Sequence, residues 1–330
     1  MHFWVDMSSP KEVLFFKVIT DELIRRGHNI TYTSRTYSGT QELIEHYGLQ
    51  VENFGRHGRN LHEKLYYSID RLHKLVKRFE FEKIDGLITL MNPEVSRIAF
   101  GLKIPIFGFC DIIEADAVAR LTLPQSKIAF IPTHIPEASV RRYYDGEILF
   151  YDCLDPACWM PEKPISQDSP MLPDVVRDNK HPLIVYRQAE TRAAYFQGYY
   201  DFTPTVVDML KKQMPEATFY GLSRYTKHTM VDVQSLLYYT DLFIGGGGTM
   251  CEEAAWWGTW ALSCRPFKTT YDMWLIEHGL MWQPPTVRDA VLKALELLTH
   301  KEKNPKCSQL NTQKFPLKMI CDAIERGAKS

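Results

Sequence analysis

The sequence lacks any apolar run that approaches the ~20 residues a membrane-spanning helix needs, so we expect a soluble or at most peripheral protein. No basic segment followed by a long apolar stretch opens the chain, and we expect no secretory signal peptide. The seven cysteines are scattered and form no Cys-x-x-Cys pair. That pattern indicates reduced thiols in a cytoplasmic protein and argues against both a disulfide framework and a bound metal.

An excess of charge of one sign is also absent. Lys plus Arg number 39 and Asp plus Glu number 40, so no net positive field favours nucleic acid as a partner. Hydrophobic residues make up 45% of the chain, which is ordinary for a globular protein. A length of 330 residues exceeds what one hydrophobic core usually serves, and two domains are therefore expected.

Short apolar segments alternate with helical patterns in both halves of the chain. Predicted strands in the first half cover residues 3–6, 30–33, 51–54, 86–90 and 104–109, and those in the second half cover residues 183–186, 218–220, 242–244 and 260–263. Strands separated by single helices indicate parallel, doubly wound sheets. Six prolines between residues 152 and 182 indicate a linker.

The predicted fold is therefore α/β, with two Rossmann-like, doubly wound parallel-sheet domains facing a cleft. Residues 1–160 form the first domain, residues 161–181 the Pro-rich linker, and residues 182–330 the second domain. Ligands of such sheets bind at the carboxyl ends of the strands.

A glycine-rich turn follows the predicted strand at residues 242–244. It consists of Gly245, Gly246, Gly247, Gly248 and Thr249, and a helix is predicted directly after it. Without side chains, backbone N–H groups can approach an anion, and the helix N-terminus adds a partial positive charge. The alternative is a turn required only for tight packing. A Walker loop is excluded because no Lys follows the last glycine.

Charged residues near this turn are candidates for the rest of a nucleotide site. Glu252 and Glu253 lie one turn into the helix, where a carboxylate can accept hydrogen bonds from a ribose diol or merely complement the helix dipole. Arg187 follows the first strand of the second half, and its planar guanidinium suits a diphosphate. A surface Arg is the alternative.

The first half offers candidates for catalysis and for acceptor binding. Asp111 and Glu114 follow the strand at residues 104–109 and can act as a general base, although loop carboxylates are often solvated bystanders. Polar groups that could contact an acceptor or a sugar are Ser8, Ser9, Lys11 and Asn92. Residues 57–83 interleave basic and apolar side chains, which indicates either a solvated amphipathic helix or one that approaches anionic lipid or a lipid-linked acceptor.

Residues 245–258 resemble the nucleotide-binding turn of GT-B glycosyltransferases and of UDP-N-acetylglucosamine 2-epimerases, in which a Glu holds the ribose and a Gly closes the helix. By its spacing from Gly258, Glu253 takes the ribose position. The whole chain is similar to the family called domain of unknown function 354. The similarity is carried by Asp6 and by residues 25–28, 111–115, 144–147, 185–187 and 236–239.

The resemblance implies a GT-B-type, metal-independent glycosyltransferase that uses a nucleoside-diphosphate sugar, UDP-linked, and no separate cofactor. It also implies that residues 1–160 form an acceptor or catalytic domain and residues 182–330 a nucleotide-sugar-binding domain. The alternatives are a UDP-GlcNAc 2-epimerase-like enzyme and a non-catalytic sugar-nucleotide-binding protein. The chain lacks the Gly-Thr-Arg-Pro-Glu opening of the 2-epimerases, which weighs against epimerisation. The sugar, the base, the acceptor, the anomeric outcome and the oligomeric state stay open.

Overall fold

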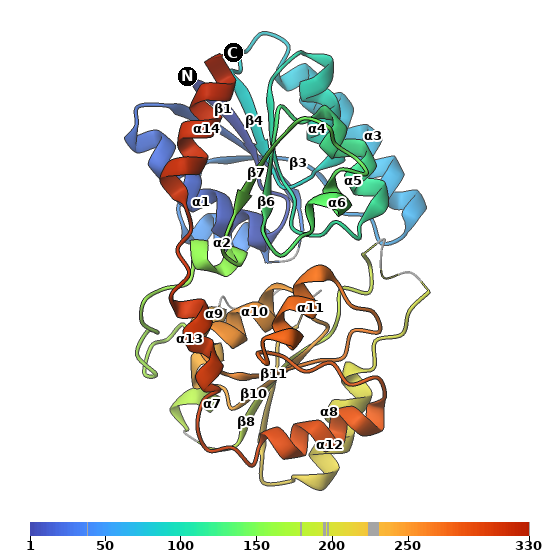
Figure 1. Ribbon diagram of the computed structural model, residues 1–330, viewed down its shortest axis with the longest axis vertical. Helices are drawn as coiled ribbons and strands as arrows, with labels where there is room; N and C mark the ends of the chain where they lie inside the picture. The colour runs from blue at the N-terminus through green and yellow to red at the C-terminus, as the bar shows by residue number, and fades with distance from the viewer. Residues whose placement is uncertain (38, 179, 194–195, 197, 224–230, 330) are drawn as a thin grey trace. The chain divides into compact units, whose positions relative to one another are not determined.

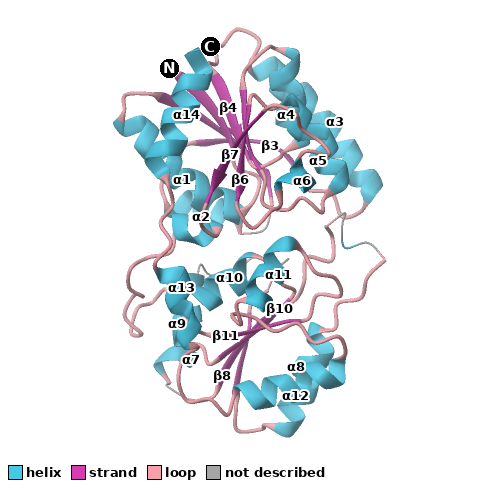
Figure 2. Cartoon of the chain, in the orientation of Figure 1, coloured by secondary structure: helices cyan, strands magenta, loops and turns pink. Residues whose placement is uncertain are grey.

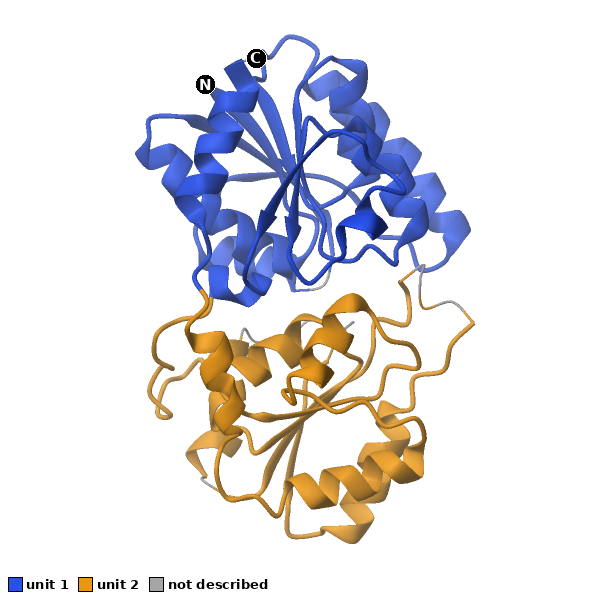
Figure 3. Ribbon diagram, in the orientation of Figure 1, with its two compact units in different colours: residues 1–159, 314–330 blue, residues 160–313 orange. Residues whose placement is uncertain are grey.

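The computed structural model describes residues 1–37, 39–178, 180–193, 196, 198–223 and 231–329. The chain divides into two compact units (Figure 3). Unit 1 comprises Met1–Trp159 and Lys314–Ser330, and unit 2 comprises Met160–Gln313. Each unit is built on its own parallel sheet, which confirms the predicted α/β class with two doubly wound units.

Unit 1 contains a seven-stranded sheet in its described residues, in the order β3-β2-β1-β4-β5-β6-β7, and all neighbouring strands are parallel. Its strands are β1 (His2–Asp6), β2 (Asn29–Thr36), β3 (Val51–Arg56), β4 (Gly86–Thr89), β5 (Ile106–Phe109), β6 (Ile128–Pro132) and β7 (Glu147–Tyr151). The strand order reverses between β1 and β4. The carboxyl ends of these two strands therefore mark the position where parallel sheets bind ligands.

Helices cover both faces of this sheet (Figure 1). On one face α1 packs beside α14, over a core that includes Phe3, Phe16 and Phe109. On the other face α3 and α4 lie side by side over Trp4 and Leu87. The helices of unit 1 are α1 (Pro10–Arg25), α2 (Thr40–His46), α3 (Leu61–Arg78), α4 (Pro93–Gly101), α5 (Asp116–Thr122), α6 (Glu137–Val140), α14 (Leu317–Lys329) and the 3-10 turns Leu123–Gln125 and Asp155–Cys158.

Unit 2 contains a four-stranded parallel sheet in its described part, in the order β11-β10-β8-β9 (Figure 2). Its strands are β8 (Leu183–Arg187), β9 (Thr218–Gly221), β10 (Leu242–Gly245) and β11 (Trp260–Ser263). Its helices are α7 (Asp174–Arg177), α8 (Thr203–Gln213), α9 (Val233–Tyr239), α10 (Thr249–Trp256), α11 (Thr270–Glu277), α12 (Val287–Leu297), α13 (Ser308–Asn311) and the 3-10 turn Pro305–Cys307. Here the order reverses between β8 and β10, which places the end of β10 at the ligand-binding position.

The end of the chain belongs to unit 1, whereas the boundaries expected from the sequence placed residues 182–330 together. Helix α14 packs on α1, and Ile320 and Ile324 are fully buried in the core of unit 1. Phe315, just before α14, meets Phe15 with ring centroids 5.3 Å apart. A helix with one strongly apolar face must bury that face, and the free face of α1 accepts it.

The Pro-rich segment, predicted to be a linker at residues 161–181, belongs to unit 2 and packs along α9. The amide of Ile165 donates to Ser235 Oγ at 3.0 Å, and Tyr239 donates its hydroxyl to the carbonyl of Ile165 at 2.8 Å. Among the described residues, every helix is too short or too polar to cross a bilayer.

Candidate functional site

The glycine turn lies at the strand-order reversal of unit 2. Gly245 is the last residue of β10 and is the register partner of Arg187, the last residue of β8. The next residues, Gly246 to Gly248, lead directly into α10, which begins at Thr249. The first N–H groups of a helix have no intrahelical acceptor, so they are available to an anion. The predicted turn is therefore at the position where a parallel sheet binds ligands.

Each glycine after the strand is required by the local geometry. A Cβ on Gly246 would come within 2.3 Å of Ala189 Cβ, so this residue is fixed by close packing. Gly247 and Gly248 have φ values of 73° and 76°, which residues with side chains rarely adopt. Close packing, one of the two explanations that the sequence left open, therefore applies to this turn, and anion binding by its backbone stays a prediction.

The buried side chain of Arg265 holds the glycine turn by a hydrogen bond to its backbone, and this residue was not identified from the sequence. Its Nε donates to the carbonyl of Gly246 at 2.8 Å, and its Nη1 donates to Asp272 at 2.8 Å. Asp272 also accepts from the amide and the hydroxyl of Thr269, both at 2.9 Å, within the capping box that starts α11. The signal for this ion pair was a Thr-x-x-Asp pattern just after an Arg, at the same edge of the sheet as the glycines.

The two acids of α10 are both buried. Glu253 Oε1 accepts a hydrogen bond from Gln234 Nε2 of α9 at 2.7 Å. The indole N–H of Trp257, the residue after α10, donates to the backbone carbonyl of Gln234 at 2.8 Å. This hydrogen bond connects the end of α10 to α9. Glu252 is as buried as Glu253. Because an ionised carboxylate is costly to bury, such acids need hydrogen-bonding partners, and Glu253 has one in Gln234.

Arg187 points toward the start of α10, where its Nη1 lies 3.2 Å from the sulfur of Met250. This contact places the guanidinium of Arg187 on the same side of the sheet as the residue after Thr249. The structure therefore places the predicted residues of unit 2 at the ends of the neighbouring strands β8 and β10 and in α10, which follows β10. These residues are Arg187, Gly245–Thr249, Glu252 and Glu253.

In unit 1 a buried polar network occupies the reversal between β1 and β4. Asp6 Oδ2 accepts from Ser8 Oγ at 2.7 Å and from Asn92 Nδ2 at 2.9 Å. Its other oxygen accepts from Thr33 Oγ1 at 2.7 Å and from the fully buried guanidinium of Arg71. Ser8 and Asn92, predicted to contact an acceptor or sugar, are thus brought together but are buried around Asp6. From the sequence, Asp6 was named only as part of the family resemblance. Sequence spacing could not predict that one carboxylate accepts hydrogen bonds from four side chains that are far apart in the chain.

Ser9 and Glu12 form a capping box at the start of α1. The Glu12 amide donates to Ser9 Oγ at 3.4 Å, and Glu12 Oε2 accepts from the backbone amides of Ser8 and Ser9. Burial, reinforced by the nearby negative charge of Asp6, raises the pKa of Glu12 to about 8. Ser9 therefore has a structural role in the loop, and Glu12 is a buried acid that the sequence did not reveal as unusual.

Lys11 links two carboxylates of unit 1. Its Nζ lies 2.6 Å from Asp111 Oδ2 and 2.7 Å from Asp155 Oδ2. Asp155 is buried and also accepts from the hydroxyl of Tyr151 at 2.6 Å. Asp111 and Lys11, assigned separately to catalysis and to acceptor binding, are thus direct partners. Glu114 is exposed in the loop that follows Asp111.

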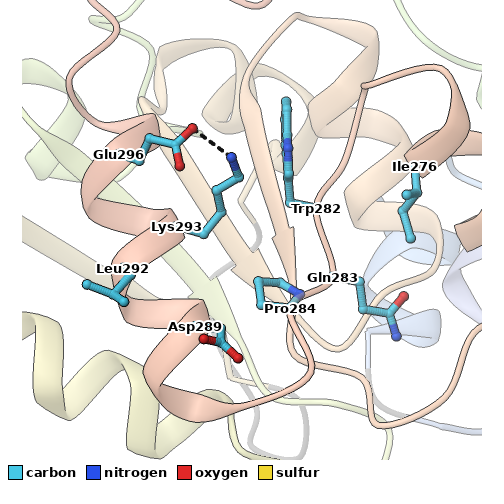
Figure 4. Close-up of a pocket in the computed structure, with 8 residues that line it drawn as sticks. All are labelled: Ile276, Trp282, Gln283, Pro284, Asp289, Leu292, Lys293 and Glu296. Carbon is cyan, nitrogen blue, oxygen red and sulfur yellow. Dashed lines mark hydrogen bonds and ion pairs between the residues drawn. The ribbon is translucent and has the colours of Figure 1, made fainter.

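A further hollow lies in unit 2 between α11, the loop that follows it, and α12 (Figure 4). It is open, and Lys293 reaches over the ring of Trp282 at 5.4 Å from the centroid. Its lining residues are Ile276, Trp282, Gln283, Pro284, Asp289, Leu292, Lys293 and Glu296. No predicted site residue is among them. Within the described part of the chain, no group of three His, Cys, Asp or Glu side chains is arranged to hold a metal ion.

Two solved structures with the same fold have known classes of activity. One is the UDP-GlcNAc 2-epimerase of Neisseria meningitidis bound to UDP-GlcNAc, with a TM-score of 0.71, 12% identity, and 100% of this chain and 99% of that chain covered. The other is the glycosyltransferase SsfS6 of Streptomyces sp. SF2575, with a TM-score of 0.62, 12% identity, and 98% and 99% covered. These proteins have the GT-B fold, and so does this chain, as the resemblance implied.

A relative in sequence is the uncharacterized protein MJ0665 of Methanocaldococcus jannaschii. It is 24% identical over 306 residues, which cover 87% of this chain and 89% of that protein. The family model described as "Protein of unknown function (DUF354)" matches residues 1–326, and the chain therefore belongs to that family.

Proposed function

We propose that this protein is a metal-independent glycosyltransferase of the GT-B type that uses a nucleoside-diphosphate sugar, with UDP as the nucleotide. The observation that carries the proposal is the glycine turn at Gly246–Gly248. It brings a backbone without side chains to the N-terminus of α10, at the strand-order reversal of unit 2. GT-B relatives that act on sugar nucleotides support the same choice of ligand.

In this proposal unit 2 holds the donor. The amides from Gly246 to Thr249 and the guanidinium of Arg187 bind the diphosphate and stabilise the negative charge that develops on it as it leaves. The carboxylate of Glu253, held by Gln234, accepts hydrogen bonds from the ribose hydroxyls. Glu252 shares the same helical turn and completes the set of candidate contacts.

Unit 1 provides the groups that act on the acceptor. Asp111, oriented by Lys11, removes a proton from the attacking hydroxyl, and Glu114 is the alternative base. Ser8, Ser9 and Asn92 shape the loop at the reversal between β1 and β4, and the acceptor contacts this loop through its surface. The oxygen of the acceptor forms a bond to the anomeric carbon as the bond from that carbon to the diphosphate breaks.

The test is nucleotide binding by isothermal titration calorimetry, with UDP, UDP-GlcNAc, UDP-glucose and the corresponding thymidine nucleotides. The wild type should bind at least one of them, and Arg187→Ala and Glu253→Ala should weaken that binding by about tenfold or more. Lys180→Ala, an exposed cation elsewhere in unit 2, serves as the control. If no nucleotide binds the wild type, the proposed donor site is wrong.

Epimerisation of a sugar nucleotide is the second candidate. It is favoured by the presence, in unit 1, of an ionisable pair rather than a single base, since Lys11 and Asp111 are in direct contact. Incubation of the bound UDP-sugar without an acceptor separates the candidates. Formation of a stereoisomer of the sugar would assign an epimerase. Binding without turnover, unchanged in Asp111→Asn and Glu114→Gln, would assign a non-catalytic sugar-nucleotide-binding protein.

A further inference from the structure

Glu94 lies at the strand-order reversal of unit 1 with its carboxylate between two arginines. It belongs to the first turn of α4, after β4. Its Oε1 is 3.7 Å from Nη1 of Arg35, and its Oε2 is 3.8 Å from Nη1 of Arg71. Both separations exceed the reach of a hydrogen bond, although an ionised carboxylate can accept several. These three residues form the Glu94 cluster.

The arginines of the cluster have donors that no acceptor satisfies in the described part of the chain. Arg71 is 1% exposed, and its Nη2 donates to Asp6 and its Nε to the carbonyl of Phe54 at 3.1 Å. Its buried Nη1, which points at Glu94, has no hydrogen-bond partner there, and neither has the buried Nε of Arg35. Because folded proteins rarely bury a polar donor without an acceptor, these groups indicate a ligand that completes them.

Two side chains of the cluster are accessible to solvent. Those of Arg35 and Glu94 are 24% and 11% exposed, whereas that of Arg71 is buried. Arg35 is the next-to-last residue of β2, and Glu94 follows β4. The cluster is therefore at the carboxyl edge of the sheet, beside the reversal between β1 and β4, where parallel sheets bind ligands.

The charges around Glu94 cancel. Arg35 and Arg71 carry two positive charges, and Glu94 and Asp6 carry two negative ones. Glu12 interacts electrostatically with Arg35 but adds no charge at neutral pH, because burial and the charge of Asp6 raise its pKa to about 8. An ion would leave this buried region with a net charge, so the balance favours an uncharged ligand.

A hydroxyl group matches the donors and acceptors of the cluster. A guanidinium only donates and a carboxylate only accepts, whereas a hydroxyl does both. One hydroxyl between Glu94 and Arg35 would donate to the carboxylate and accept from the guanidinium. A second hydroxyl on the neighbouring carbon of a sugar ring would do the same between Glu94 and Arg71. Because both protein partners are charged, such hydrogen bonds are stronger than those between neutral groups.

We infer that the Glu94 cluster binds two neighbouring hydroxyls of an uncharged sugar, which makes an uncharged carbohydrate the acceptor. The role of this sugar as an acceptor rests on the proposed function, whereas its binding does not. A phosphate or a carboxylate fits less well. It would displace Glu94 from Arg35 and Arg71 and leave that carboxylate without its cations at a largely buried position.

The experiment is titration of the full chain with glucose, galactose and mannose, followed by saturation-transfer difference NMR. Each sugar is compared with its uronic acid, which adds one negative charge to the same ring. At least one neutral sugar should bind, and its uronic acid should bind more weakly. Glu94→Gln should weaken the binding of that neutral sugar by about tenfold or more, because a charged acceptor becomes a neutral one.

Arg35→Lys tests the site with little effect on the fold. The guanidinium of Arg35 contacts Glu94 at 3.7 Å without a hydrogen bond, so lysine should leave the melting temperature nearly unchanged. It should still weaken sugar binding, because the planar fork of donors is lost. Arg97→Gln is the matched control, since Arg97 is an exposed arginine of the same helix, and it should leave sugar binding unchanged.

Absence of binding for all three neutral sugars, or binding that Glu94→Gln and Arg35→Lys do not alter, overturns the inference. Tighter binding of a uronic acid than of its parent sugar also overturns it and assigns an anion site. Titration of the wild type with UDP separates the two proposals. Sugar binding without nucleotide binding would refute the proposed function alone, and nucleotide binding without sugar binding would refute the sugar site alone.

Discussion

Arg265 donates from Nε to the carbonyl oxygen of Gly246 at 2.8 Å, so a buried cation supports the turn that we propose holds a diphosphate. Its partner Asp272 is fully buried. Arg265→Ala should therefore lower the free energy of unfolding by about 3 kcal/mol, because it leaves the Asp272 carboxylate without its cation. Urea denaturation measures this change.

The double variant Arg265→Ala with Asp272→Asn tests whether the unpaired carboxylate of Asp272 causes the loss of stability. If the unpaired carboxylate is responsible, the second substitution should recover part of the lost stability. Lys268→Ala, an exposed cation three residues away, should change the unfolding free energy by less than about 0.5 kcal/mol. Equal effects of Lys268→Ala and Arg265→Ala would contradict the assigned role of Arg265.

Gly247→Ala should destabilise the turn in two ways, by backbone strain and by a steric clash of the new methyl group. The φ of 73° is unfavourable for alanine, and the new Cβ would lie 2.8 Å from Arg265 Cζ. We expect a loss of about 3 kcal/mol in unfolding free energy and loss of nucleotide binding. Gly27→Ala isolates the backbone contribution, since Gly27 has a φ of 86° and nothing within 4 Å of the added Cβ. It should destabilise by about 1 kcal/mol and leave nucleotide binding intact.

Much of the fold could be predicted because in each unit short apolar strands alternate with helices. Strands β1, β4, β8 and β11 were expected close to their observed bounds, since they are short apolar runs between helices. Strands β6 and β7 were not predicted. The assignment of α14 to unit 1 could not be predicted either, because sequence order does not reveal that a helix packs on α1, which lies about three hundred residues earlier.

Most of the candidate site of unit 2 could be located from the sequence because its residues, apart from Arg187, are contiguous. Gly245–Thr249 with Glu252 and Glu253 form a single strand-turn-helix passage, and local spacing describes it fully. The supporting groups come from other elements. Gln234 and Arg265 reach the passage from α9 and from the loop after β11, and only the tertiary structure shows these contacts.

Lys11→Met should destabilise unit 1 more than the loss of a surface cation would. Lys11 is the cation between Asp111 and Asp155, and Asp155 is buried. Leaving two carboxylates close together without that charge should lower the free energy of unfolding by about 3 kcal/mol. Differential scanning calorimetry measures the effect. Lys103→Met, at an exposed position of unit 1, is the control and should leave the melting temperature nearly unchanged.

Glu12→Gln should change how stability depends on pH. The carboxyl group of Glu12 has a pKa raised to about 8 by burial, from an ordinary value of 4.5. In the folded protein it keeps its proton up to about pH 8, whereas in the unfolded chain it loses the proton near pH 4.5. The unfolded state is therefore favoured as pH rises between these values, by up to about 1.4 kcal/mol per pH unit.

Glutamine stays neutral at all pH values and retains a carbonyl oxygen for the amides of Ser8 and Ser9, so the capping box survives. Urea denaturation at intervals from pH 5 to pH 9 should show a smaller decline in stability for Glu12→Gln than for the wild type. Glu22→Gln provides a contrast, because hydrogen bonds from Arg25 and Arg26 lower the pKa of Glu22 to about 2, outside this range. Its stability should decline between pH 5 and pH 8 in parallel with the wild type. Parallel curves for Glu12→Gln and the wild type would instead mean that Glu12 is ionised in the folded protein, stabilised by the amides that it accepts from.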